Sequence, residues 1–260
     1  GDGHGLGAQA GDLARQLDRA PEAPLLFSLA LAGLSRLELD AARGHGMLLH
    51  QRGQTERDSI LLAQSEYILG IIGFWQGDLI AAQRFFNAVL VHYEPAHRAT
   101  HLQHYGQDPE PICGMRLACT LWFLGDPHAA LQARDEALTI ASTSGHPISY
   151  ASTLAFAGIL ALEMGDYARL RTHVSDLLSN AGADGPLHLY AAAEVYKAFL
   201  EVLDNPASSS GILRMRRVLD DAALAEQAPG QDALFLRVLL EACWIAGDAV
   251  TGLHAADRLL

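Results

Sequence analysis

The sequence predicts an all-α chain that forms a right-handed solenoid of about six antiparallel helical hairpins. The first observation is a recurring turn, in which a Gly-Asp pair follows an apolar helix end and a new helix begins at once. The pair occurs at Gly77-Asp78, Gly125-Asp126, Gly165-Asp166 and Gly247-Asp248, with a weaker copy at Asn205-Pro206. Successive copies lie 48, 40, 40 and 42 residues apart. A fixed period of about 40 residues is typical of stacked helical hairpins.

Two further observations support this fold class. Half of the residues are hydrophobic, which is enough for a continuous core along a repeat array. No segment shows sustained two-residue alternation, so no strand is expected. We therefore expect residues 8–260 to form a single array. The glycine-rich residues 1–7 lack the charged and apolar regions of a signal peptide and are interpreted as a flexible leader.

Charge and cysteine content exclude several classes of protein. The net charge is −12, and Lys197 is the single lysine, so the chain lacks the basic stripe that binds nucleic acid or anionic membranes. No apolar run approaches the roughly 20 residues that span a bilayer. The three cysteines, Cys113, Cys119 and Cys243, form no C-x-x-C pair. They are typical of buried, reduced thiols, which places the chain in the cytoplasm.

The N-terminal elements follow from apolar spacing and turn residues. Residues 8–19 are predicted to be the end of an earlier helix, and residues 22–36 and 37–49 a helical pair. Gly53-Gln54 is expected to break the pattern. Thr55 to Asp58 then matches a capping box, which would open a helix ending at Gln76.

The partner helix carries apolar residues from Leu79 to Leu90, and the one irregular insertion follows at residues 94–107. Asp108 and Pro109 restart a helix, because Asp favours the N-cap and Pro the first helical position. Later hairpins are predicted to open at Gly145-His146-Pro147, Gly185-Pro186 and Pro229-Gly230, and residues 205–211 to form a flexible turn. Because no polar capping repeat closes the array at Leu260, the chain is expected to be a piece of a longer protein.

The insertion and its borders supply most candidate binding residues. In residues 105–109, Gly106 suits a tight turn and Asp108 a helix cap, while Tyr105 and Gln107 are candidates for facing a ligand. Arg98, Arg116 and Arg134 could join Tyr105 in a carboxylate-binding groove, although surface ion pairs explain them equally well. Two tyrosines that follow helix-starting prolines are further candidates for a concave face: Tyr150 and Tyr190.

The sequence contains no complete metal-binding or catalytic motif. Four histidines fall within thirteen residues in and just before the insertion, at His92, His97, His101 and His104, but no H-E-x-x-H spacing accompanies them. We interpret them as solvated or backbone-pairing groups and expect no metal. No nucleophile, phosphate loop or cofactor motif is present, so neither an enzyme nor a cofactor is expected. Four aromatics next to the Gly-Asp turns are expected to fill the core: Trp75, Trp122, Phe123 and Trp244.

Several strings together resemble a known group of proteins. They are Tyr93-Glu94-Pro95, His97-Arg98, Tyr105 to Pro109, residues 121–131 and Gly145-His146-Pro147. Over residues 62–178 the chain resembles the tetratricopeptide-like C-terminal regions of bacterial multidomain signalling ATPases of the STAND type, which carry cyclase, kinase or DNA-binding output domains. Glu94 stands where aspartate is usual, and the period is longer than the 34 residues of strict tetratricopeptide repeats.

This resemblance implies a non-catalytic regulatory and protein-interaction module that docks a protein partner or its own ATPase and output domains. The alternative is a sensor that binds a sugar or metabolite inducer in the superhelical groove, as the comparable arm of the maltose-type activators does. A protein dock requires a broad exposed patch with an aromatic or Arg anchor. A sensor requires a deep pocket with convergent polar groups.

Overall fold

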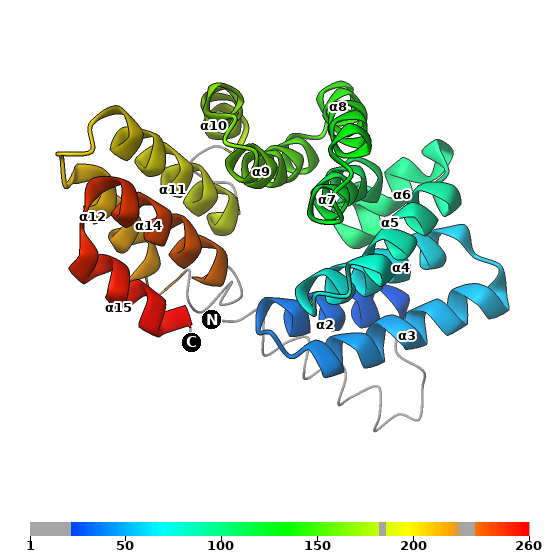
Figure 1. The fold of residues 1–260 in the computed structure, drawn as a ribbon. Coiled ribbons are helices and arrows are strands. Elements are labelled where there is room, and N and C mark those ends of the chain that lie inside the picture. The colour runs from blue at the N-terminus through cyan, green and yellow to red at the C-terminus, as the bar shows by residue number, and fades with distance from the viewer. Residues whose placement is uncertain (1–21, 182–185, 222, 224–231, 260) are drawn as a thin grey trace. The chain divides into compact units, whose positions relative to one another are not determined.

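The computed structural model describes residues 22–181, 186–221, 223 and 232–259. These residues form thirteen α-helices and one short 3-10 helix, and they contain no strand, as the sequence predicts. The chain divides into two compact units, residues 1–144 and 145–260, whose helices are labelled in Figure 1. The predicted leader and the predicted helix at 8–19 lie outside the described residues, as do Gly185 and Pro229-Gly230.

The first unit consists of successive helical pairs. Helix α2 packs against α3, α4 against α5, and α7 against α8, while α3 with α4 and α5 with α7 join one pair to the next. The short helices η1 and α6 lie between α5 and α7 in sequence. The bounds are α2 Ala23–Ser35, α3 Leu39–Glu56, α4 Ser59–Trp75, α5 Leu79–His92, η1 Pro95–His97, α6 Arg98–Tyr105, α7 Pro109–Phe123 and α8 Pro127–Thr143.

The second unit repeats this pattern. Helix α9 packs against α10, α11 against α12, and α14 against α15, and α10 with α11 and α12 with α14 join the pairs. The bounds are α9 Pro147–Glu163, α10 Tyr167–Ala181, α11 Leu187–Asp204, α12 Ser210–Leu219, α14 Asp232–Ala246 and α15 Ala249–Leu259. None of the described helices combines the length and the apolar character needed to cross a bilayer.

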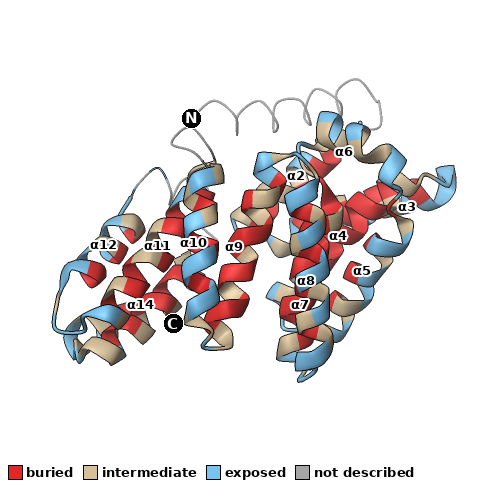
Figure 2. Cartoon of the chain, turned by 90° about the horizontal axis from the view of Figure 1, so that it is seen from above, coloured by how far each residue is buried: buried red, intermediate tan, exposed pale blue. Residues whose placement is uncertain are grey.

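Helix α4 is the centre of the first unit. It is buried at Leu61 and continuously from Ala63 to Gly73 (Figure 2), because α2, α3, α5 and α7 all pack against it. Close packing depends on small residues at the crossings. A Cβ at Gly70 would lie 2.6 Å from the ring of Phe86, which is fully buried.

The Gly-Asp turns join the two helices of a pair as predicted. Gly125 has φ of +84°, a left-handed conformation that glycine adopts without steric cost. The amide of Asp126 donates to the carbonyl of Leu121 at 3.0 Å, which closes the end of α7. The carboxylate of Asp126 accepts from the amide of Ala129 at 3.0 Å and so caps α8. The other Gly-Asp turns share the positive φ at glycine: Gly77, Gly165 and Gly247.

The structure adds one turn that the sequence pattern misses. Leu37 has φ of +59° and lies 40 residues before Gly77, at the position that glycine holds in later turns. The amide of Glu38 donates to the carbonyl of Gly33 at 2.8 Å, the same bond that Asp126 makes. Among the described residues, the first turn of this kind is therefore at Leu37, where a branched side chain adopts a strained left-handed conformation.

Replacing this residue by glycine is expected to stabilise the protein. Leu37→Gly removes the left-handed strain, and Leu37 is 46% exposed, so little buried area is lost. We expect a net gain of about 0.5–1 kcal/mol in the free energy of unfolding after the greater chain entropy of glycine is subtracted. Urea unfolding measures it. Gly125→Ala is the reciprocal control and should cost a similar amount, because a Cβ there meets nothing within 4 Å and only the conformation is affected. A lower urea midpoint for Leu37→Gly would contradict this account.

Two local predictions are wrong. Helix α3 does not break at Gly53 but continues to Glu56, because Gly53 packs closely against the next helix: its added Cβ would lie 3.0 Å from the amide nitrogen of Leu62. Thr55 is not a cap, since it lies inside α3 and its hydroxyl donates to the carbonyl of Gln51. The N-cap of α4 is Asp58, whose carboxylate accepts from the amides of Ile60 and Leu61. At residues 205–211 the chain forms a turn, and α12 begins at Ser210.

Candidate functional site

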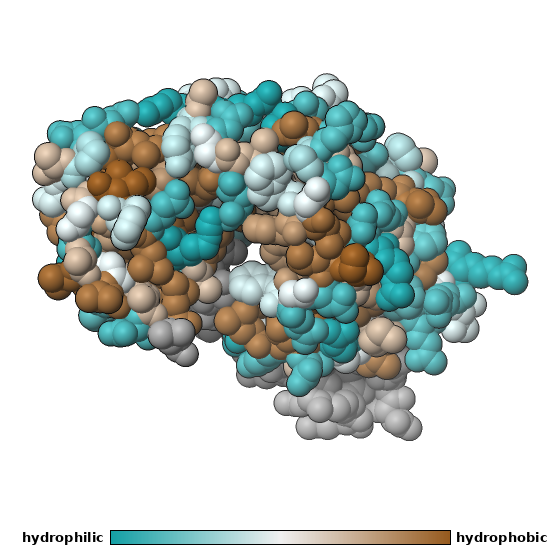
Figure 3. Space-filling model, viewed as in Figure 1, coloured by the Kyte–Doolittle hydropathy of each residue, from teal (hydrophilic) through white to brown (hydrophobic). Residues whose placement is uncertain are grey.

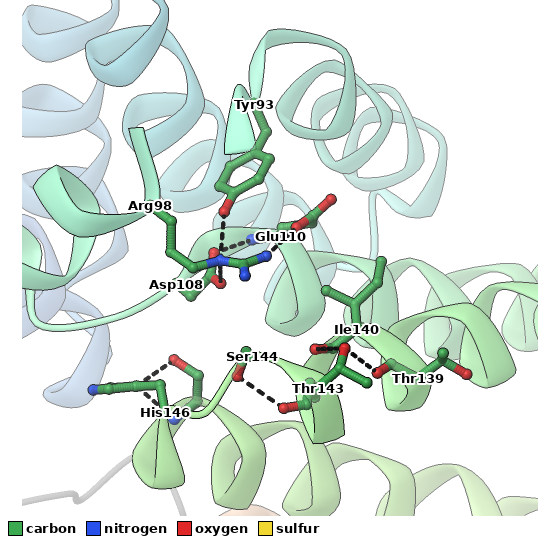
Figure 4. Close-up of polar contacts among 11 residues, drawn as sticks. Tyr93, Arg98, Asp108, Glu110, Thr139, Ile140, Thr143, Ser144 and His146 are labelled. Carbon is green, nitrogen blue, oxygen red and sulfur yellow. Dashed lines mark hydrogen bonds and ion pairs between the residues drawn. The ribbon is translucent and has the colours of Figure 1, made fainter. Parts of the chain in front are cut away.

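The predicted irregular insertion is mostly helical and brings four polar side chains together (Figure 4). Arg98, the first residue of α6, donates from Nε to the hydroxyl of Tyr93 at 3.2 Å. The same Nε lies 2.9 Å from Oδ2 of Asp108, and Nη2 lies 3.2 Å from Oε2 of Glu110. We call Tyr93, Arg98, Asp108 and Glu110 the insertion cluster.

The insertion cluster depends on the turn between α6 and α7. Gly106 has φ of +71° and its amide donates to the carbonyl of Leu102, which ends α6. Asp108 then caps α7 by accepting from the amide of Glu110, and Pro109 is the first residue of that helix, as predicted. The turn places the carboxylate of Asp108, which is fully buried, directly against Arg98.

Burial and hydrogen bonding shift the pKa of three members of the insertion cluster. Desolvation raises the pKa of Tyr93, and it also raises the pKa of Glu110, with the charge of Asp108 adding to the effect. The hydrogen bond to Tyr93 is the main cause that raises the pKa of Arg98. Arg98 thus carries a charge that two carboxylates of its own chain already neutralise. This is a structural ion-pair cluster rather than an open receptor for an anionic ligand.

The ring of Tyr105, the last residue of α6, lies close to other rings. Its ring meets Phe27 edge-on at 5.2 Å between centroids, and the ring of Phe27 stacks with Tyr67 at 6.4 Å. The ring centroids of Tyr105 and His101 lie 6.4 Å apart. Burial raises the pKa of Tyr105 to about 12. Tyr105 therefore contributes mainly to packing between α2 and α6.

Arg116 and Gln107 also approach the interior of the first unit. The guanidinium of Arg116 lies 5.7 Å from the ring centroid of Tyr67, and both Arg116 and Gln107 interact with the Tyr67 side chain. Of the predicted binding residues, Arg98, Tyr105, Gln107 and Arg116 thus lie in one region of the first unit. Tyr150, on α9, is half-buried, and Tyr190, on α11, is 44% exposed; both belong to the second unit.

Three buried polar residues of α4 each contact a histidine. Gln64 hydrogen-bonds His101 of α6 at 2.8 Å, and Ser65 hydrogen-bonds His50 of α3 at 3.2 Å. Glu66 pairs with His92 of α5 at 2.7 Å. We call these six residues the polar row.

The polar row changes the interpretation of the histidines. A solvated role is wrong for His101, which is 1% exposed and stacks on Tyr93 with 5.4 Å between ring centroids. His97, by contrast, lies at the surface beside Ser59 and Glu94. Within the described residues, no group of three His, Cys, Asp or Glu side chains is arranged to hold a metal ion.

The polar row predicts a loss of stability in mild acid. Burial lowers the pKa of His101 and, with the neighbouring His92, that of His50. The unfolded chain then binds more protons than the folded chain below about pH 6.5, so the free energy of unfolding falls as the pH drops from there toward the folded pKa values. Burial raises the pKa of Glu66. The effect of Glu66 on stability therefore has the opposite sign: its contribution to the free energy of unfolding is present in acid and is lost as the pH rises through its folded pKa.

Urea unfolding at pH 7.5 and pH 5.5 measures this difference. His101→Gln should lose less stability between the two pH values than the original chain does. His128→Gln, which changes an exposed histidine of α8, is the control and should leave the pH dependence unchanged. Equal pH dependence in the original chain and His101→Gln would contradict the assignment.

The aromatics at the Gly-Asp turns are more exposed than predicted. Trp75 is 38%, Phe123 45% and Trp244 87% exposed, and Trp122 is half-buried, so the prediction that all four fill the core is wrong. All four residues lie in the last turn of a helix, next to a Gly-Asp turn. Phe74 and Phe123, from successive pairs, nevertheless lie in contact with 6.0 Å between ring centroids. We call Phe74, Trp75 and Phe123 the turn-end aromatic cluster.

A scan against models of known protein families finds no match to this chain. A search of curated proteins finds no similar sequence.

Proposed function

We propose that this chain is a right-handed, tetratricopeptide-like solenoid of helical pairs that serves as a non-catalytic regulatory and protein-interaction module. The repeated pairing of successive helices and the turns spaced by about 40 residues support the solenoid. The resemblance over residues 62–178 favours a signalling or transcription-regulating ATPase as its parent. In that setting the module docks a partner protein or the parent's own ATPase and output domains.

The turn-end aromatic cluster is the observation that carries this proposal. Trp75 and Phe123 expose large ring surfaces, and the contact of Phe123 with Phe74 holds two neighbouring pairs in one apolar patch. Large aromatic side chains are the residues that most often anchor protein interfaces. Partner docking therefore accounts for rings that the interior of the unit does not bury.

The inducer-sensor alternative draws on Tyr105, Gln107, Arg98 and Arg116. Arg98 is neutralised by Asp108 and Glu110, and Tyr105 packs on Phe27. A ligand would have to displace these contacts and compensate for them. This cost makes the alternative the weaker candidate.

The test is a selection of helical peptides on the purified chain by phage display, followed by affinity measurements on variants. We expect enriched peptides to lose at least tenfold in affinity with Phe123→Ser or Trp75→Ser. Val91→Ser is the matched control, because Val91 is an exposed apolar residue (79%) of α5 outside the cluster. The control variant should bind the selected peptides as the original chain does.

A thermal-shift panel of sugars, nucleotides and amino-acid metabolites tests the alternative directly, since a ligand that binds the folded state raises its melting temperature. Selected peptides whose affinity is unchanged by both Phe123→Ser and Trp75→Ser would contradict docking at the turn-end aromatic cluster. A saturable shift with one metabolite, lost in Gln107→Ala, would favour the sensor.

A further inference from the structure

The Gly-Asp turn between α9 and α10 pairs both of its acidic residues with arginines. The carboxylate of Asp166 lies 3.0 Å from the guanidinium of Arg169. Glu163, two residues before Gly165, forms an ion pair with Arg237 of α14. This turn of the second unit therefore has its negative charges neutralised by its own chain.

The two Gly-Asp turns of the first unit carry an exposed ring where this turn has Glu163. The ring is Trp75 in the turn between α4 and α5, and Phe123 in the turn between α7 and α8. Their exposed fractions are 38% and 45%, and both belong to the turn-end aromatic cluster. A partner that docks on this cluster also meets the acidic residues of the same two turns.

These acidic residues, Asp78 and Asp126, are exposed, and neither forms an ion pair with any described residue. Each carboxylate caps a helix by accepting one amide hydrogen bond of 3.0 Å, from Ala81 and Ala129 respectively. An ionised carboxylate can accept further hydrogen bonds, including those from the second oxygen's side. Two exposed negative charges thus accompany the two exposed rings.

The order of the helices places rings and carboxylates alternately at the turn ends of the first unit. Helix α4 ends at Trp75, α5 begins after Asp78, α7 ends at Phe123 and α8 begins after Asp126. The ring contact between Phe74 and Phe123 shows that the ends of α4 and α7 meet, and α5 packs against α7. Packed helices lie about 8–10 Å apart, a distance that roughly two turns of a partner helix span. We call the turn-end aromatic cluster together with Asp78 and Asp126 the turn-end surface.

Other charged groups near the turn-end surface do not cancel its negative charge. Arg43 of α3 brings one positive charge, and its guanidinium donates to the side-chain oxygen of Gln76. In the preceding turn, Arg36 and Glu38 neutralise each other at 2.9 Å. On the face of the first unit that Figure 3 shows, hydrophobic residues lie directly beside hydrophilic ones. The chain as a whole carries a net charge of −12, which attracts positively charged partners.

We propose that the turn-end surface binds a basic amphipathic helix of a partner protein. Apolar side chains of that helix cover Trp75 and Phe123, while its Lys or Arg side chains pair with Asp78 and Asp126. This inference rests on the proposed docking function and adds the chemistry of the partner. Covering the rings also removes water from the neighbouring carboxylates, so a partner that supplies cations there is favoured over a neutral or acidic one.

Fluorescence anisotropy with two labelled helical peptides tests the proposal. Each peptide is about 18 residues long, enough for a stable helix, with leucine along one face. The opposite face carries lysine in one peptide and glutamate in the other. We expect the lysine peptide to bind the chain at least tenfold more tightly than the glutamate peptide, and to lose at least tenfold in affinity with Phe123→Ser.

The role of the carboxylates is tested by a double variant, Asp78→Asn with Asp126→Asn. Asparagine caps a helix about as well as aspartate, so the circular dichroism spectrum and the melting temperature should not change. The matched control is Asp166→Asn with Asp248→Asn, which makes the same replacements in the second unit and gives the same net charge. We expect the lysine peptide to bind the first double variant about fivefold more weakly, as the loss of two exposed ion pairs allows, and to bind the control like the original chain.

Two results would overturn the proposal. Equal affinity of the lysine peptide for the two double variants would show that net charge, rather than the turn-end surface, attracts it. Equal affinity of the lysine and glutamate peptides for the original chain, or no binding of either, would show that the turn-end surface does not select a basic helix. The proposed function is judged separately, because the phage-display selection admits peptides of any charge. Selected peptides that depend on Trp75 and Phe123 but lack Lys and Arg would contradict this inference alone.

Discussion

Arg98→Ala is expected to destabilise the first unit by about 3 kcal/mol, the low end of the range for breaking a buried ion pair. The substitution leaves the carboxylate of Asp108, which is 0% exposed, without the cation that lies 2.9 Å from it. It also removes the donor to the Tyr93 hydroxyl and the partner of Glu110. Because Arg98 belongs to α6 and Asp108 caps α7, both helices should loosen together.

Urea unfolding followed by circular dichroism measures this loss. Arg171→Ala is the matched control, because Arg171 pairs with Asp204 where both side chains are about half-exposed (47% and 60%). An exposed pair of this kind contributes less than about 1 kcal/mol. If the two alanine variants unfold at the same urea concentration, the insertion cluster is not the stabilising feature that its burial indicates.

Gly211→Ala is expected to cost about 2–3 kcal/mol, because the added methyl group has no space. Its Cβ would lie 2.5 Å from the carbonyl oxygen of Ala198 and 2.7 Å from Cγ2 of Val202, both on α11. The carbonyl belongs to the helix backbone and cannot rotate away. Helix α12 must therefore move off α11, which weakens the main contact of that pair.

The same substitution at Gly44 is the control for Gly211→Ala. Gly44 lies inside α3, and a Cβ there meets nothing within 4 Å. Alanine should stabilise α3 by about 0.5–1 kcal/mol, since glycine is the poorer helix former. Comparison of the two melting temperatures separates crowding at the α11–α12 contact from helix propensity. A stable Gly211→Ala variant would show that the two helices separate at little cost.

Local chemistry explains which parts of the fold could be predicted from the sequence. The Gly-Asp turns were identified correctly because one residue must adopt positive φ and the next must cap a helix, and few residue types do either. Asp108 and Pro109 were assigned for the same reason. Leu37 was missed because its left-handed conformation is imposed by the pairing of α2 and α3, against its own preference. The sequence does not distinguish a glycine inside a helix from a glycine that ends one, so Gly53 is wrongly predicted to break α3.

The polar row could not be predicted because its members lie far apart in sequence. Gln64 and His101 are 37 residues apart, and Ser65 and His50 are 15 apart. A signal was present in the run Gln64-Ser65-Glu66, which interrupts an otherwise apolar helix. Three polar residues in succession on a helix buried on every side require three internal partners. The partners are histidines of three different helices, α6, α3 and α5.

The polar row also limits how α4 can rotate about its own axis. A helix turns by about 100° per residue, so three successive side chains point in three directions that together span most of its circumference. Each direction has its own receiving histidine, from α6, α3 and α5 in turn. An entirely apolar helix could pack at several rotational angles of similar energy. Helix α4, in contrast, forms all three hydrogen bonds at a single rotational angle. The contacts of Gln64, Ser65 and Glu66 together select one orientation of the central helix α4.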